Sequence, residues 1–167
     1  TAFHPRAMQA GLARILAGGT PVVADVEMIC VGLSKPRLAH FGIGTHQFIS
    51  DPDVIDAARR DDTTRAVQAM RKAHRRGLLE GAIVGIGNAP TALIEVVRLI
   101  REEGCRPALV IGMPVGFVSA AESKALLMEI DTVPWVAIRG RKGGSTLVVA
   151  ALHALLGLAE AHQRGAA

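Results

Sequence analysis

The sequence predicts an α/β fold in which helices cover both faces of a mostly parallel sheet. Short apolar, β-branched runs alternate along the chain with segments of helical periodicity. Such alternation requires crossover connections, which join parallel strands. Half of the 167 residues are hydrophobic, which suffices for one buried core. No repeat or linker divides the chain, so we expect a single three-layer α/β/α domain over residues 1–167.

We expect buried strands where short apolar, β-branched runs are bounded by Gly, Pro or Asp. In chain order they cover residues 21–24, 47–49, 82–86, 108–111 and 135–138. The expected helices lie between and around them, at residues 5–17, 52–60, 65–79, 90–103, 120–130 and 146–162. The tail after His162, ending in Ala167, is expected to be loose.

Start signals support several of these helices. Ser119 and Glu122 match the S-x-x-E capping box, and Ser50 with Asp53 is a weaker version of it. Asp62, Thr63 or Thr64 is expected to cap the helix that opens at Arg65.

Composition argues against nucleic-acid binding, the familiar metal motifs and a membrane span. The net charge of +4 is modest, and with no Tyr, one Trp and four Phe the chain lacks the aromatic platforms typical of single-strand nucleic-acid binding. Cys30 and Cys105 belong to no ligand cluster, and the six histidines have no metal-binding spacing. No membrane span is predicted, and the cysteine usage suits the cytoplasm. Neither His40 nor His46, which lie near loops, has an evident catalytic partner.

Three strand-to-helix turns carry the candidate site. The first, residues 83–91, runs through Gly85, Gly87 and Asn88 to Pro90, so backbone amides at a helix start could face an anion. It is not a dinucleotide fingerprint, because Pro90 replaces the third glycine. In the structural alternative, Asn88 caps the helix, Pro90 sits in its first turn, and the glycines only permit a tight turn.

The second turn, residues 111–119, is an apolar loop with two glycines and a proline, which suits a large, flat and partly hydrophobic ligand. Turn geometry alone also explains such residues, and Glu122 more often completes a capping box than binds a ligand.

The third turn, residues 139–145, places Arg139, Arg141 and Lys142 among three glycines. It does not match a P-loop, but its guanidinium groups and amides suit carboxylates, with a solvated flexible loop as the alternative. The basic cluster at residues 71–76 is interpreted as a solvated helix surface.

Taken together, the three turns resemble the precorrin-8X methylmutase family. The matching stretches are residues 87–92, residues 112–118 continuing into 121–124, Arg139-Gly140, and residues 143–145. Asp25 with Glu27-Met28, and Thr64-Arg65-Ala66, look like the family as well. The resemblance extends from about Pro5 to His153.

The resemblance implies a flavodoxin-like domain that isomerises precorrin-8X to hydrogenobyrinic acid, or the cobalt-containing counterpart, by methyl migration in cobalamin biosynthesis. It implies a homodimer with its site near the subunit interface, and no redox cofactor, nucleotide cofactor or metal. The substrate-binding residues that it implies, with the loops above, are Thr64, Arg65, Asn88, Pro90, Thr91, Pro114, Val115, Gly116, Phe117, Lys124, Arg139, Arg141, Gly143, Gly144 and Ser145.

The family's proton-exchanging histidine is expected upstream of Thr1, because His4 does not fall in its motif. No residue of the printed chain is therefore expected to be catalytic, and the N-terminal segment is expected to be missing. A non-catalytic corrinoid- or tetrapyrrole-binding protein is the alternative, and a nucleotide-binding flavodoxin-like module is a third hypothesis.

Overall fold

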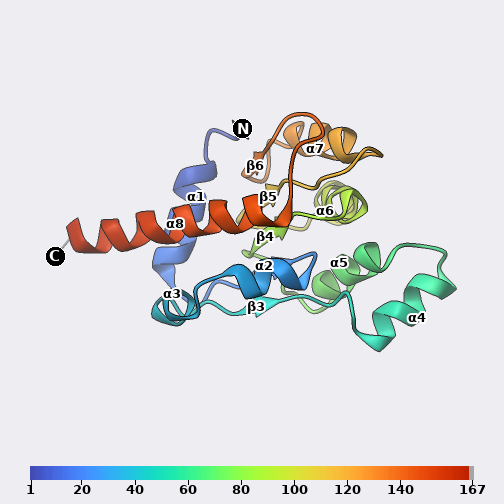
Figure 1. The fold of residues 1–167 in the computed structure, drawn as a ribbon, viewed down its shortest axis with the longest axis horizontal. Helices are drawn as coiled ribbons and strands as arrows, with labels where there is room; N and C mark the ends of the chain where they lie inside the picture. The colour runs from blue at the N-terminus through green and yellow to red at the C-terminus, as the bar shows by residue number, and fades with distance from the viewer. Residues whose placement is uncertain (166–167) are drawn as a thin grey trace.

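The computed structural model describes residues 1–165 and has the expected three layers (Figure 1). Its six strands form one sheet in the order β1-β6-β5-β4-β2-β3. The strands are β1 (Ala2–Phe3), β2 (Val22–Ala24), β3 (Thr45–His46), β4 (Ile83–Ile86), β5 (Leu109–Gly112) and β6 (Trp135–Ala137). All neighbouring pairs are parallel except β1 and β6. The order of the parallel strands is that of flavodoxin-like folds, so the predicted fold class is confirmed.

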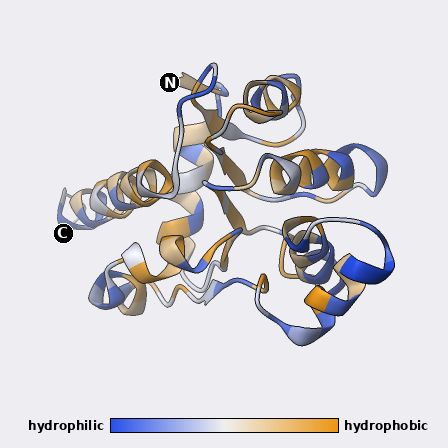
Figure 2. Cartoon of the chain, turned by 45° about the vertical axis from the view of Figure 1, so that its right-hand side comes forward, coloured by the Kyte–Doolittle hydropathy of each residue, from blue (hydrophilic) through white to orange (hydrophobic). Residues whose placement is uncertain are grey.

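Each face of the sheet has its own helical layer and its own apolar core. On one face pack α1 (Ala7–Ala17), α2 (Glu27–Gly32), α3 (Lys35–His40) and α8 (Ser145–Gly165). On the other face pack α4 (Pro52–Arg60), α5 (Arg65–Arg75), α6 (Pro90–Glu102) and α7 (Ala120–Met128). Hydrophobic residues lie along the strands and on the helix surfaces turned toward them (Figure 2).

Side-chain alternation along the strands explains the two cores. Val23 contributes to the core beneath α5 and α6, whereas its neighbours Val22 and Ala24 contribute to the core beneath α8. Ile83 and Val84 divide in the same way. Both faces are buried, which is why these strands are continuously apolar in sequence.

Short elements account for most differences from the sequence-based expectations. The sequence analysis did not predict β1, α2 and α3, each of six residues or fewer. The second expected strand, residues 47–49, lies at Thr45–His46 instead. The expected helix over residues 65–79 ends at Arg75.

Helix starts were predicted with mixed success. Thr64 caps α5 as expected, because its Oγ1 accepts a hydrogen bond from the Val67 amide at 3.2 Å. The two capping boxes are wrong. Ser119 has a φ of 60°, outside the extended region that a capping residue normally adopts, and makes no side-chain cap. The residue that precedes α4 is Asp51, and its carboxylate binds Lys72.

Helix α8 is long and apolar enough to cross a membrane by length and composition alone, which the sequence analysis did not predict. Its apolar side chains Val148, Leu152, Leu155, Leu156 and Ala159 are buried against the sheet and α1. This packing is that of a core helix. The helix continues to Gly165, so the expected loose tail is wrong up to that residue, and Ala166 and Ala167 lie outside the described residues.

A buried carboxylate links α5 to α6. Glu95 on α6 is 5% exposed, and its Oε1 accepts hydrogen bonds from Arg71 on α5 at 2.9 Å and from Arg98 at 2.6 Å. Burial alone would raise the pKa of Glu95, but the two guanidinium groups outweigh this and hold the pKa below its usual value. The ionised form is therefore the one that stabilises the fold.

We predict that Glu95→Gln lowers the free energy of unfolding at neutral pH by about 1.5–3 kcal/mol, the scale of hydrogen bonds to charged groups. A carboxyl whose pKa is lowered in the folded state contributes stability above its unfolded pKa of 4.5, and the contribution disappears as pH falls through the folded value. Urea unfolding at a series of acid pH values should therefore show that the free energy of unfolding falls less with decreasing pH in the variant than in the parent. Glu102→Gln on the same helix is the control, because Glu102 is exposed and should change stability little. Parallel acid profiles for parent and Glu95→Gln would contradict the assignment.

Candidate ligand-binding site

The three loops singled out in the sequence meet at the carboxyl edge of the sheet. They are the β4–α6 turn (residues 87–89), the β5–α7 loop (residues 113–119) and the β6–α8 loop (residues 138–144). The amide of Gly144 donates a hydrogen bond to the carbonyl of Met113 at 2.8 Å. A β-carbon on Gly87 would lie 2.5 Å from the Cα of Ser145, so only glycine permits this approach. The three loops follow β4, β5 and β6, which are neighbouring parallel strands of the sheet.

Asp25 fixes the first of these loops. It follows β2 directly, its side chain is fully buried, and its two carboxylate oxygens accept hydrogen bonds from the amides of Gly87 (3.0 Å), Asn88 (2.8 Å) and Ala89 (2.7 Å). Burial raises the pKa of Asp25, and the backbone hydrogen bonds partly offset this effect. The carboxylate thus binds the start of α6 to the neighbouring strand.

This arrangement changes the interpretation of the glycine turn. The amides that could have faced an external anion already have an internal one, the Asp25 carboxylate. The structural alternative is partly right, because Pro90 occupies the first turn of α6. Asn88 does not cap α6, because the residue that directly precedes this helix is Ala89 and no side chain caps its amino terminus. The geometry gives the nucleotide hypothesis no phosphate site at this turn.

Lys124 joins the other two loops. Its side chain is fully buried in α7, and its ammonium group donates hydrogen bonds to the carbonyl of Pro114 at 3.1 Å and to that of Lys142 at 2.7 Å. Desolvation lowers the pKa of this lysine. The sequence predicted a ligand contact for Lys124, whereas the structure places its charge beneath the loops, where it holds the β5–α7 loop against the β6–α8 loop.

The outer surface of these two loops is apolar and cationic. Phe117 and Val118 are 88% and 81% exposed, an unusual exposure for such side chains. The guanidinium of Arg141 lies 6.0 Å from the centre of the Phe117 ring. Arg139, Arg141 and Lys142 are exposed, and no acidic side chain among residues 1–165 forms an ion pair with them. They precede α8, whose amino terminus also favours negative charge.

The remaining predicted site residues lie close to these loops or within them. Thr64 and Thr91 share a hydrogen bond between their hydroxyl oxygens at 3.0 Å, which places the start of α5 beside the start of α6. Arg65 follows Thr64 and is exposed. Pro114 is buried, and Gly143 packs so closely on the carbonyls of Met113 and Pro114 that a β-carbon would not fit. Gly116 lies in open space.

Four of the six histidines contact parts of the molecule outside the three loops. His4 packs edge-on against Trp135, and His40 hydrogen-bonds Gln163. His153 lies 3.1 Å from the carbonyl of Gly32, and His74 pairs with Glu103. Among residues 1–165, no hydrogen bond joins a histidine to the three loops.

An apolar hollow of about 290 Å³ lies beside the site, on the α1 and α8 face of the sheet. The exposed side chains of Phe3, Met8 and Leu147 line it, together with Ile111 and Met113. Exposed apolar surface of this kind typically contacts another segment or subunit.

Two functional roles were missed by sequence reasoning. Asp25 was noted only as part of a resemblance, and Lys124 only as a possible ligand contact. A polar residue directly after a buried strand, or on the apolar side of a helix, is the signal that could have found them, because a buried charge needs specific partners.

Comparison with known proteins agrees with these observations. The family model of precorrin-8X methylmutase matches residues 1–158. The cobalt-precorrin-8 methylmutase of Leptospira interrogans is 49% identical over 161 residues, covering 93% of this chain and 73% of the relative. The cobalt-precorrin-8 methylmutase of Priestia megaterium is 52% identical over 158 residues, which cover 95% of this chain and 68% of the relative. A crystal structure of precorrin-8X methylmutase from Thermus thermophilus is 49% identical, with a TM-score of 0.87 over 96% of this chain and 77% of that one.

We predict that Asp25→Asn lowers the free energy of unfolding by about 1.5–3 kcal/mol, because a charged acceptor is lost and an amide group faces backbone N–H donors. Hydrogen exchange at the amides of Gly87, Asn88 and Ala89 should accelerate. Glu27→Gln, an exposed substitution two residues away, is the matched control. Urea unfolding and exchange measured by NMR provide the test, and unchanged exchange at the three amides would show that Asp25 does not hold the turn.

Proposed function

This chain belongs to the precorrin-8X methylmutase family, and from that membership we propose that it isomerises precorrin-8X, or its cobalt-containing counterpart, by methyl migration in cobalamin biosynthesis. The relatives carry both substrate names, so the choice between the two substrates is a matter for experiment. A reaction of this kind occurs within one molecule and needs a protein that holds a large corrin precursor still while a proton is exchanged.

The observation that carries the proposal is the combination of cations and apolar side chains on the β5–α7 and β6–α8 loops. A corrin precursor presents a broad apolar ring with carboxylates around its rim. Val115 and Phe117 offer exposed apolar surface, while Arg139, Arg141 and Lys142 offer positive charge free of acidic partners among residues 1–165. Guanidinium groups bind carboxylates in a bidentate manner, which fixes orientation as well as affinity.

We assign the other contacts more broadly. The Thr64 and Thr91 hydroxyl pair, with exposed Arg65 and Asn88, forms a polar edge at the start of α5 and α6. Backbone amides of Gly143 and Ser145 at the start of α8 can meet one carboxylate, helped by the helix dipole. The amide of Gly144 is occupied by the Met113 carbonyl, so Gly144 shapes the loop. Pro114 and Gly116 shape the apolar loop, and Pro90 with Lys124 supports the site from within.

A homodimer in the cytoplasm is part of the proposal. The apolar hollow beside the site and the exposed Phe3, Met8 and Leu147 support a covered surface at this face. Light scattering after size exclusion would test it, with about twice the 17.5 kDa of one chain as the expected mass.

The resemblance assigns the proton-exchanging group to a histidine upstream of the stretch that matches Phe3-His4-Pro5, and within residues 1–165 no histidine is hydrogen-bonded to the three loops. A non-catalytic corrinoid-binding protein is the second candidate function, and the same loops would serve it. The two differ in chemistry but agree on the ligand.

We predict that Arg139→Ala and Arg141→Ala each weaken the binding of hydrogenobyrinic acid by about 1.5–3 kcal/mol, or about 10- to 150-fold, because each removes a charge-assisted contact. Absorbance titration of the corrinoid measures this. Arg164→Ala, near the far end of α8, removes an equal charge and should leave the affinity within about twofold. Equal affinities in all three variants would refute the assignment of the β6–α8 loop to carboxylate binding.

We predict further that binding and chemistry separate. Residues 1–167 should bind hydrogenobyrinic acid, while methyl migration of precorrin-8X should require the chain that includes the upstream histidine. Product formation by residues 1–167 at the rate of the longer chain would place the proton-exchanging group within the printed sequence, and His40 and His46 would be the first to substitute. Failure of both chains to convert the substrate, with binding retained, would favour the non-catalytic alternative.

A further inference from the structure

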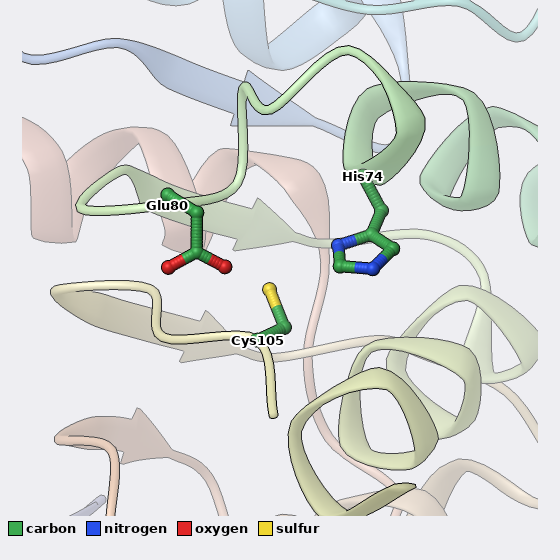
Figure 3. Close-up of side chains that lie close together, drawn as sticks. All are labelled: His74, Glu80 and Cys105. Atoms are coloured by element: carbon green, nitrogen blue, oxygen red, sulfur yellow. The ribbon is translucent and has the colours of Figure 1, made fainter. Parts of the chain in front are cut away.

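Three potential metal ligands meet at the amino edge of the sheet, opposite the loops described above. Glu80 precedes β4, Cys105 precedes β5, and His74 lies in the last turn of α5. One ligand atom from each residue lies within 4.8 Å of the other two. In Figure 3 the Cys105 sulfur lies between the imidazole of His74 and the carboxylate of Glu80.

The imidazole of His74 is oriented as in a metal site. Its Nε2 lies 3.0 Å from Oε2 of Glu103, and the other oxygen of that carboxylate, Oε1, accepts a hydrogen bond from Arg98 at 2.8 Å. A neutral ring that donates from Nε2 has its lone pair on Nδ1. Nδ1 is buried and has no hydrogen-bond partner, and Figure 3 shows it on the side of the ring turned toward Cys105 and Glu80. A carboxylate behind a ligating histidine is the usual second layer of a zinc site.

Cys105 and Glu80 complete the set. Cys105 is 1% exposed, and its sulfur lies within 4.8 Å of a ligand atom of both His74 and Glu80. Both oxygens of Glu80 lie near the amide of Arg106, at 3.2 and 3.3 Å, which aligns the carboxylate from behind. Glu80 is exposed, so a cation could reach the cluster from solvent at this side.

We propose that Nδ1 of His74, Sγ of Cys105 and one carboxylate oxygen of Glu80 bind a single zinc ion, with water as the fourth ligand. Zinc binding would displace the thiol proton of Cys105 to solvent. The resulting thiolate and one carboxylate balance the charge of a divalent cation, and the thiolate selects zinc over magnesium or calcium. Zinc–ligand distances of about 2.0–2.3 Å place tetrahedral ligands about 3.3–3.8 Å apart. The cluster must therefore contract by about 1 Å when the ion binds.

The neighbouring positive charges do not oppose this assignment. Arg71 binds Glu95, and Arg98 binds Glu95, Glu102 and Glu103, so both guanidinium groups are matched by carboxylates. The guanidinium of Arg106 donates to the carbonyls of Ile100 and Cys105. A zinc ion here would connect α5 to the segments that enter β4 and β5, and would act on stability rather than on the ligand site.

The test uses the untagged protein, freed of metal and kept reduced, titrated with Co²⁺ near neutral pH. We expect one equivalent of Co²⁺ to give the absorbance of a tetrahedral thiolate complex, and Zn²⁺ to displace it. Cys105→Ser should abolish the thiolate band, and Cys30→Ser, which removes the other cysteine, should retain it. His74→Gln and Glu80→Gln should weaken binding at least tenfold, and Glu103→Gln about 10- to 100-fold, the usual effect of a second-layer partner.

Several outcomes would overturn the proposal. They are the absence of a one-to-one thiolate complex, loss of the band in Cys30→Ser, or unchanged affinity in His74→Gln with native circular dichroism. Should Cys105→Ser fail to fold, His74→Gln and Glu80→Gln decide the question, because neither residue is fully buried. Zinc should also raise the melting temperature of the parent but not that of His74→Gln.

Discussion

The position of the Asp25 carboxylate determines how the loops are arranged at the carboxyl edge of the sheet. It lies between β2 and β4, where the strand order of the sheet reverses and ligands of this fold class usually bind. By accepting three amides from the β4–α6 turn, it closes an anion site that the fold would otherwise offer. These hydrogen bonds hold the start of α6 in a fixed position, in which Gly87 packs against the start of α8. We therefore propose that the β6–α8 loop, and not this turn, recognises negative charge.

Lys124 performs a matching task from the opposite side. A buried ammonium without a carboxylate partner must satisfy its donors on carbonyls, and the two that it binds belong to different loops. Its burial therefore fixes the separation of the apolar loop from the cationic one. In the proposed site, this arrangement lets a broad ligand that is apolar in the middle and charged at its rim make both kinds of contact together.

Sequence reasoning succeeded where the signal is local. The apolar runs of β4 and β5 and the glycine loops after them follow from neighbouring residues, so the fold class and the three loops were predictable. It failed where conformation depends on distant partners. Ser119 and Glu122 match a capping box, yet the loop anchored by Lys124 leads into α7 with Ser119 at a positive φ. The two-residue strand β1 exists only through its pairing with β6, which no local pattern reveals.

The two edges of the sheet illustrate the same distinction. At the carboxyl edge, each loop carries its chemistry within a few consecutive residues, so a motif is visible in the sequence. At the amino edge, His74, Glu80 and Cys105 are separated by 6 and 25 residues, and only the parallel pairing of β4 with β5 and the packing of α5 bring them together. The absence of a regular histidine and cysteine spacing therefore excludes the familiar zinc motifs without excluding a zinc site. Ligand sets assembled by sheet register have to be sought in the structure, by looking for a buried donor atom that lacks a partner.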